Sequence, residues 1–181
     1  MESTGKLLRV TTELERRSMA LYARFAKLFG ADAKLREFWF GMARDEARHV
    51  AALDLVSTVL DLEEKLEMAS PISLEDATIR RLRAILDRAE AEAGGSRNFP
   101  LKRALETALE IEETELEDKV GYLLKALQDP EEYGRCLRLL VHDLGELSYM
   151  IERHCDDAAL LQRCDAIVNH HMATLRAASQ A

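Results

Sequence analysis

The sequence contains few residues that interrupt helices. Only three prolines and eight glycines occur among its 181 residues, while leucine, alanine, glutamate and arginine dominate. These abundant residues favour helices, and glycine and proline are the residues that helix interiors tolerate least. No alternating pattern typical of strands competes with the helical one. We therefore predict an all-α fold, and 181 residues are enough for one domain with a substantial core.

The chain also lacks the features of several protein classes. No apolar run is long enough to span a bilayer, and the segment MESTGKLLRVTTELERR at the N-terminus is charged throughout, without an apolar signal core. A net charge of −8 argues against nucleic acid or an anionic membrane as the main partner. The three cysteines, Cys136, Cys155 and Cys164, form no C-x-x-C pair. We expect them to be packing residues in a cytoplasmic protein.

Helical periodicity and helix-ending residues divide the chain into six segments. Pro71 stops the second segment, the motif SLED at 73–76 is typical of a capping box that opens the third, and Gly94 and Gly95 end the third. Short loops join the first two helices and the fourth and fifth, which indicates two antiparallel pairs with a helical crossover between them. The expected helices span about 3–29, 33–68, 73–93, 100–127, 131–154 and 156–178.

Acidic side chains lie on helix faces that should be buried. At about 100° per residue, each of four helices combines an apolar arc with at least one carboxylate inside that arc. The opposite face of the first helix carries its basic residues, and Glu13 lies there too. The candidate residues are Glu15 in the first helix, Glu46 and His49 in the second, Glu112 and Glu115 in the fourth, and Asp143 and Glu146 in the fifth.

Such carboxylates would repel one another in a dry interior. A lone buried carboxylate already costs several kcal/mol unless it is neutralised. Lys119 is the one basic side chain that shares these faces. Bound cations would neutralise these carboxylates most simply, so we predict a pair of metal ions. Carboxylates with one or two imidazoles suit iron best, with manganese or zinc as alternatives.

An internal repeat relates the two halves of the chain. Glu15 and Glu46 are 31 residues apart, and so are Glu112 and Asp143, which defines an offset of 97 residues. A rival offset of 100 residues aligns Glu15 with Glu115 in the sequence. The first offset fits the helix faces better, while the second keeps Glu115 as a candidate ligand.

Together these motifs resemble the ferritin-like diiron carboxylate superfamily, and within it the rubrerythrin family. The resemblance covers about residues 3–154 and departs from the family in the second half. There, D-L-G-E with Asp143 and Glu146 replaces a second E-x-x-H, and Lys119 replaces an apolar or aromatic residue. The matching features are Glu15 followed seven residues later by Tyr22, E-x-x-H at Glu46 and His49, and E-x-x-E at Glu112 and Glu115.

The resemblance implies a ferritin-like antiparallel four-helix bundle with a helical crossover and an additional C-terminal helix, all in one domain. It implies two irons, bridged by carboxylates such as Glu46 and either Asp143 or Glu112. Glu15 would be a terminal ligand, His49 would complete the same iron site, and Tyr22 would lie close by as a possible catalytic residue. The implied activity is reduction of peroxide, or oxidation of ferrous iron with oxygen. Because the rubredoxin-type C-x-x-C motifs are missing, any electron donor would be a separate protein, or the reaction would be ferrous oxidation alone.

The residues leave a second function class open. A ferritin-like bundle with a degraded site could act without catalysis, as a metal-binding or dimeric interaction module. A salt bridge from Lys119 to the carboxylates would favour this class. In either class we expect a homodimer, formed through the last helix or through an apolar flank of the fifth helix at Leu137, Val141, Leu144 and Ile151.

Overall fold

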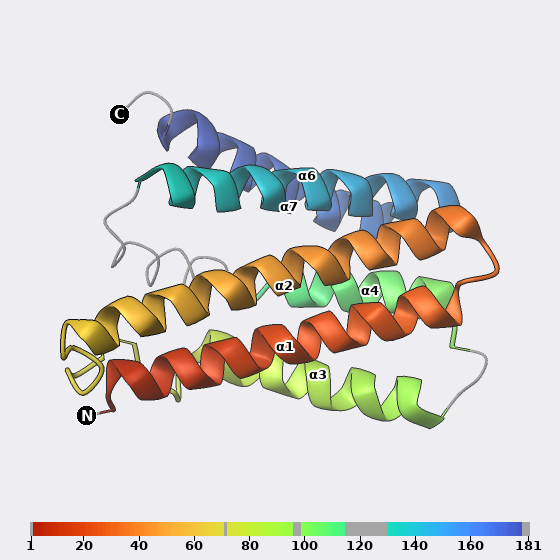
Figure 1. Ribbon diagram of the computed structural model, residues 1–181. Coiled ribbons are helices and arrows are strands. Elements are labelled where there is room, and N and C mark those ends of the chain that lie inside the picture. The colour runs from red at the N-terminus through yellow and green to blue at the C-terminus, as the bar shows by residue number, and fades with distance from the viewer. Residues whose placement is uncertain (1, 71, 96–98, 115–129, 179–181) are drawn as a thin grey trace.

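The structure is a computed structural model that describes residues 2–70, 72–95, 99–114 and 130–178 (Figure 1). Within these ranges all regular elements are helices, and one isolated bridge pairs Ser3 with Ala69. The predicted all-α class is thereby confirmed. The helices are α1 (Thr4–Leu28), α2 (Ala33–Leu62), α3 (Ala77–Gly95), α4 (Leu101–Glu112), α6 (Pro130–His154) and α7 (Ala158–Ala178).

Side-chain caps determine where the first two helices begin. The Ser3 hydroxyl accepts a hydrogen bond from the Lys6 amide, and the Asp32 carboxylate accepts from the amides of Lys34 and Leu35. Each cap satisfies amide groups that have no partner inside the helix. The turn between α1 and α2 is therefore short, and the two helices run side by side in opposite directions (Figure 1).

The second helix is shorter than the sequence predicts. It ends at Leu62 rather than near Met68, and Glu64 follows with a positive φ of 56°. The carbonyls of Leu66 and Met68 instead accept hydrogen bonds from the Gly5 and Thr4 amides, at 2.8 and 2.9 Å. These bonds satisfy the first amides of α1, a tertiary contact that a local helical pattern cannot reveal.

The third helix also begins later than predicted. Residues 73–76 form a turn, in which the Ser73 hydroxyl accepts from the Glu75 amide at 3.1 Å. The Asp76 carboxylate then accepts from the Thr78 amide at 2.9 Å, so α3 starts at Ala77. Two polar residues compete for the cap here, and the later one is used. The prediction that a capping box at 73–76 opens this helix is therefore wrong.

The fourth helix ends at Glu112 in the described part of the chain, although the sequence predicts continuation to about residue 127. Glu113 and Thr114 form a turn, with a 2.9 Å hydrogen bond from the Thr114 amide to the Ile111 carbonyl. The remainder of the expected range, including Glu115 and Lys119, lies outside the described residues.

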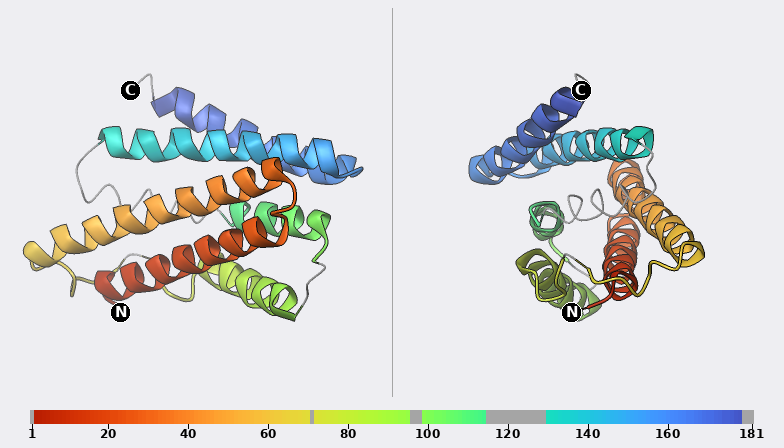
Figure 2. Two further views of the ribbon diagram at one scale, coloured as in Figure 1. Left: turned by 45° about the vertical axis from the view of Figure 1, so that its right-hand side comes forward. Right: turned by 90° about the vertical axis from the view of Figure 1, so that its left-hand side faces the viewer.

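The helices alternate in direction along the chain, and α6 and α7 lie together on one side of the other four (Figures 1 and 2). Helix α1 packs against α2 and α3, and α4 packs against α3 and α6. Helix α6 contacts α2 on one side and α7 on the other. None of the described helices combines the length and the hydropathy that crossing a membrane requires.

Aromatic side chains lock α1 against α2 near the turn that joins them. Trp39 is fully buried, and its ring centroid lies 4.9 Å from that of Phe25 and 4.7 Å from that of Phe38. Phe99, which precedes α4, stacks on Phe25 at 5.4 Å. Each such pair contributes about 0.5–1.5 kcal/mol beyond the burial of its area. The cluster therefore fixes the register of α1 relative to α2.

The last helix covers the apolar flank of α6 within the same chain. Leu144 is buried against Ile167, Val168 and Leu175 of α7, and Ile151 lies in the main core. Leu144 and Ile151 are thus already packed and are not available to a partner chain. Val141 is partly exposed, and the Leu137 side chain lies outside what the structure describes, so the predicted homodimer stays a prediction.

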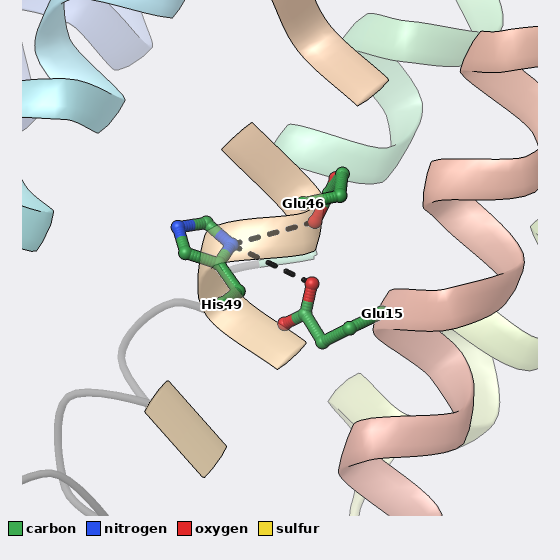
Figure 3. Close-up of side chains that lie close together, drawn as sticks. All are labelled: Glu15, Glu46 and His49. Atoms are coloured by element: carbon green, nitrogen blue, oxygen red, sulfur yellow. Dashed lines mark ion pairs between the residues drawn. The ribbon is translucent and has the colours of Figure 1, made fainter. Parts of the chain in front are cut away.

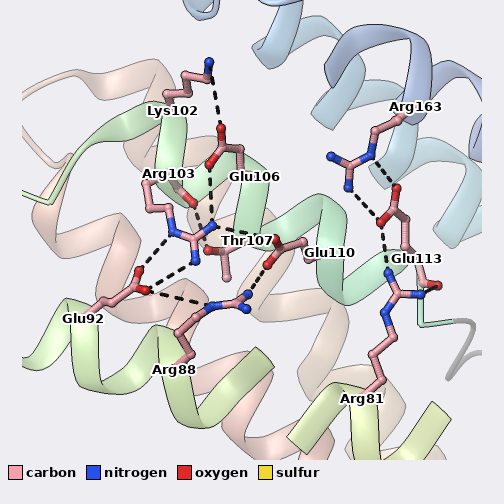
Figure 4. Close-up of polar contacts among 10 residues, drawn as sticks. All are labelled: Arg81, Arg88, Glu92, Lys102, Arg103, Glu106, Thr107, Glu110, Glu113 and Arg163. Carbon is pink, nitrogen blue, oxygen red and sulfur yellow. Dashed lines mark hydrogen bonds and ion pairs between the residues drawn. The ribbon is translucent and has the colours of Figure 1, made fainter. Parts of the chain in front are cut away.

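Ion pairs tie the C-terminal end of α4 to two other helices (Figure 4). The Glu113 carboxylate accepts two hydrogen bonds from Arg163 of α7, at 2.9 and 2.8 Å, and one from Arg81 of α3, at 3.2 Å. Arg81 also donates to the Glu113 backbone carbonyl at 3.2 Å. The Glu113 side chain is only 18% exposed, so this anchor is partly shielded from solvent.

Glu113→Gln should lower the free energy of unfolding by about 2 kcal/mol, because it weakens hydrogen bonds to two guanidinium groups and leaves them without a charged partner. Urea unfolding followed by circular dichroism measures the change. Glu63→Gln is the control, since Glu63 pairs with Lys65 on an exposed turn, and it should cost less than about 0.5 kcal/mol. Equal effects of the two variants would contradict the anchoring role of Glu113.

Candidate metal site

Two adjacent helices bring two carboxylates and one imidazole together in the interior (Figure 3). Glu46 and His49 lie on neighbouring turns of one face of α2, as their three-residue spacing requires, and Glu15 faces them from α1. The His49 Nδ1 atom is 3.5 Å from Glu15 Oε2 and 3.4 Å from Glu46 Oε2. Candidate ligand atoms of the three residues all lie within 4.8 Å of one another.

The group is almost completely removed from solvent. Glu15, Glu46 and His49 are 2%, 6% and 9% exposed. Within the described part of the chain, Glu15 Oε1, Glu46 Oε2 and His49 Nδ1 are buried and have no hydrogen-bond partner. The contacts of His49 are close enough to act electrostatically but are not hydrogen bonds. Unsatisfied buried polar atoms are costly, and a cation would satisfy all three.

The electrostatics of the group follow from burial and mutual proximity. Burial raises the pKa of Glu46 well above its usual value, and the neighbouring Glu15 carboxylate adds to this effect. Burial also opposes the charged forms of Glu15 and His49, but the contacts within the group outweigh burial. The pKa of Glu15 is therefore lowered, and the pKa of His49 is raised well above its usual value. Burial and contacts thus favour the charged forms of Glu15 and His49 and the neutral form of Glu46.

The donor set fits a metal ion. Two carboxylates and one imidazole nitrogen are ligands that iron, manganese and zinc all accept. The buried group of Glu15, Glu46 and His49 could therefore hold a metal ion, as the sequence predicts. This set of three donors does not select one of these metals.

Glu112 is buried at the last position of α4. Tyr22 of α1 donates a hydrogen bond from its hydroxyl to Glu112 Oε1 at 3.2 Å. The Tyr22 ring is fully buried and its centroid lies 5.9 Å from that of Trp39. The structure therefore places Glu112 in the interior, oriented by Tyr22, although it is not part of the group of three.

The two candidates of α6 lie elsewhere. Asp143 is close to Asp45 of α2 and contacts the ring of His142 at 3.2 Å. Glu146 is exposed. The structure thus does not bring Asp143 or Glu146 into the group with Glu46. The other candidate of the second half, Glu115, lies outside the described residues.

Asp45 is a residue that the sequence analysis missed. It is 6% exposed, forms an ion pair with Arg48, and faces Asp143. Its position next to Glu46, at the edge of the buried arc of α2, could have indicated a second acidic contact. The carboxylate of α6 therefore meets the side of α2 that carries Asp45 rather than Glu46.

Comparisons of the chain with protein-family models, with curated proteins and with solved structures gave no match. The function must therefore be argued from the geometry of the site.

Metal binding should release protons, because a ligating imidazole and a ligating carboxylate must both be deprotonated. Calorimetric titration with Co²⁺ in two buffers that differ in ionisation enthalpy measures the number of protons released. Glu46→Gln should release fewer protons, since the group favoured in its neutral form is then missing. Binding without proton release would contradict the protonation states given above.

Asp143→Asn should stabilise the protein at neutral pH. Burial and the nearby Asp45 carboxylate raise the pKa of Asp143 to about 6 from 3.8, so the folded state loses stability as the pH rises between these values. Above pH 7 the variant should be more stable than the wild type by about 1–2 kcal/mol. Solvent screens the group, so this difference is smaller than the full pKa shift of Asp143 implies. Below pH 4 the difference should vanish. Urea unfolding at both pH values measures it.

Proposed function

We propose that this chain is a ferritin-like dimetal carboxylate protein, similar to rubrerythrins, which reduces peroxide or oxidises ferrous iron with oxygen. The single observation that supports this proposal is the buried group of Glu15, Glu46 and His49. These residues belong to the motifs that carry the resemblance, and their polar atoms are unsatisfied in the interior.

The order of the helices agrees with the proposal. Antiparallel α1 and α2 form the first pair, α3 follows as a crossover, and α4 and α6 pack against each other in opposite directions (Figures 1 and 2). A ferritin-like arrangement requires two such pairs with a long connection between them. Helix α7 then corresponds to the additional C-terminal helix.

Each proposed ligand has a distinct structural role. Glu15, Glu46 and His49 would hold one metal ion, and Glu112 is the best described candidate for a second. Tyr22 orients the Glu112 carboxylate through its hydroxyl, as groups that contact metal ligands commonly do. When bound, iron would supply the electron transfer to peroxide or oxygen. The burial of all three residues would keep bulk water away from the ion.

A second candidate function is a bundle with an incomplete site that binds metal without catalysis. The positions of Asp143 and Glu146 favour it, because neither joins the group of three. A site of this kind would hold one ion and would serve as a metal-binding or dimeric interaction module. Metal stoichiometry distinguishes the two functions.

Protein purified from iron-supplemented cells should contain about two irons per chain, and its visible spectrum should change reversibly on addition of peroxide and a reductant. Metal analysis and absorbance spectroscopy measure both properties. Glu15→Gln should reduce the iron content at least about tenfold at limiting iron. Glu13→Gln is the matched control, because Glu13 is exposed on the same helix, and it should retain the iron.

Each alternative result has a defined meaning. One ion per chain without a response to peroxide would support the incomplete site. Absence of metal, with no loss of thermal stability after chelator treatment, would contradict metal binding altogether.

A further inference from the structure

A cavity of about 590 Å³ lies between α2 and the N-terminal half of α6. Apolar side chains form most of its wall, and Leu55 at its rim is 53% exposed. The cavity shares only His49 with the group of three acidic and imidazole side chains, and the proposed function does not use it. The lining residues are Arg48, His49, Ala51, Ala52 and Leu55 of α2, and Arg135 and Leu139 of α6.

Two guanidinium groups line this cavity from different helices. Arg48 comes from α2 and Arg135 from α6, in a chain whose net charge is −8. Arg48 also pairs with Asp45, and Arg135 has a polar partner of its own. A guanidinium carries five N–H donors, so Arg48 keeps donors beyond its pair with Asp45 that can contact a ligand. The cavity therefore combines two guanidinium groups with apolar walls.

The size of the cavity indicates an organic ligand. Pockets for small organic molecules have volumes of about 300–1,000 Å³, whereas a water molecule occupies about 30 Å³ in the liquid. Peroxide or oxygen alone would leave most of this space to water. A ligand with several carbon atoms would contact Leu55 and Leu139 and displace that water.

We propose that this cavity binds a short-chain aliphatic monocarboxylate, with its charged end at Arg48 and Arg135 and its hydrocarbon part along Leu55 and Leu139. Guanidinium groups match the planar geometry of a carboxylate and can bind both of its oxygens. The apolar walls select a ligand with one charge and a hydrocarbon body over a compact anion with two charges. This inference goes beyond the proposed function and does not require a bound metal.

His49 connects the cavity with the candidate metal site. Its Nδ1 atom faces Glu15 and Glu46, while its other ring nitrogen points away from both carboxylates (Figure 3). The same residue lines the cavity. A carboxylate bound there lies next to a candidate metal ligand, so its presence alters the surroundings of the site.

Calorimetric titration of the full chain with sodium butanoate, both as purified and after chelator treatment, tests the proposal. We expect saturable binding at one site per chain. Arg48→Gln and Arg135→Gln should each weaken the affinity at least about tenfold, since each removes a charge-assisted hydrogen bond. Arg44→Gln and Arg138→Gln are matched controls, one on each helix, because neither residue lines the cavity, and both should bind like the wild type.

A second variant keeps the proposal testable if an arginine variant unfolds. Ala51 lines the cavity and is exposed, so Ala51→Leu should narrow the cavity without disturbing the core and should weaken butanoate binding. Butan-1-ol and inorganic phosphate should bind at least tenfold more weakly than butanoate, the first for lack of charge and the second for lack of a hydrocarbon body. No saturable binding of butanoate, equal affinities in the arginine variants and their controls, or equal binding of phosphate would overturn the proposal.

Discussion

The close packing of α1 against α2 is the constraint on which the candidate site depends. Glu15 comes from one helix, and Glu46 and His49 come from the other, so a shift of one helical turn, about 5.4 Å, would separate them. The aromatic cluster around Trp39 fixes this register from a position seven residues before Glu46 on α2. Apolar packing at one end of the helix pair thus determines where polar atoms meet in its middle.

Burial of this polar group carries an energetic cost that local protonation reduces. Contacts favour opposite charges on Glu15 and His49, and burial favours the neutral form of Glu46. That arrangement lowers the repulsion but leaves three buried atoms without hydrogen-bond partners among the described residues. A site that is stabilised incompletely by its own side chains is a common property of binding sites, where stability is exchanged for function. This incomplete satisfaction is the physical basis for our metal proposal.

The second half of the molecule differs from the first in how its acidic residues are used. Glu112 is buried at the end of α4, and the next residue, Glu113, anchors that end to Arg81 of α3 and Arg163 of α7 (Figure 4). Two adjacent glutamates therefore have different roles, one directed into the interior and one holding the helix in place. On α6, Asp143 meets Asp45 rather than the group of three. The internal repeat in the sequence is thus not matched by an equivalent arrangement of side chains.

Sequence periodicity alone determined the helical class, the burial of Glu15, Glu46, His49 and Glu112, and the pairing of Glu46 with His49 on one face, because these properties depend on spacing within a single helix. It did not determine the early end of α2, because the carbonyls of Leu66 and Met68 bind amides of α1 that are distant in sequence. It also could not place Asp143 beside Asp45, since the rotation of α6 relative to α2 depends on how α6 packs against α4 and α7. Contacts between helices, which involve residues far apart in the chain, decided which of the buried acids meet.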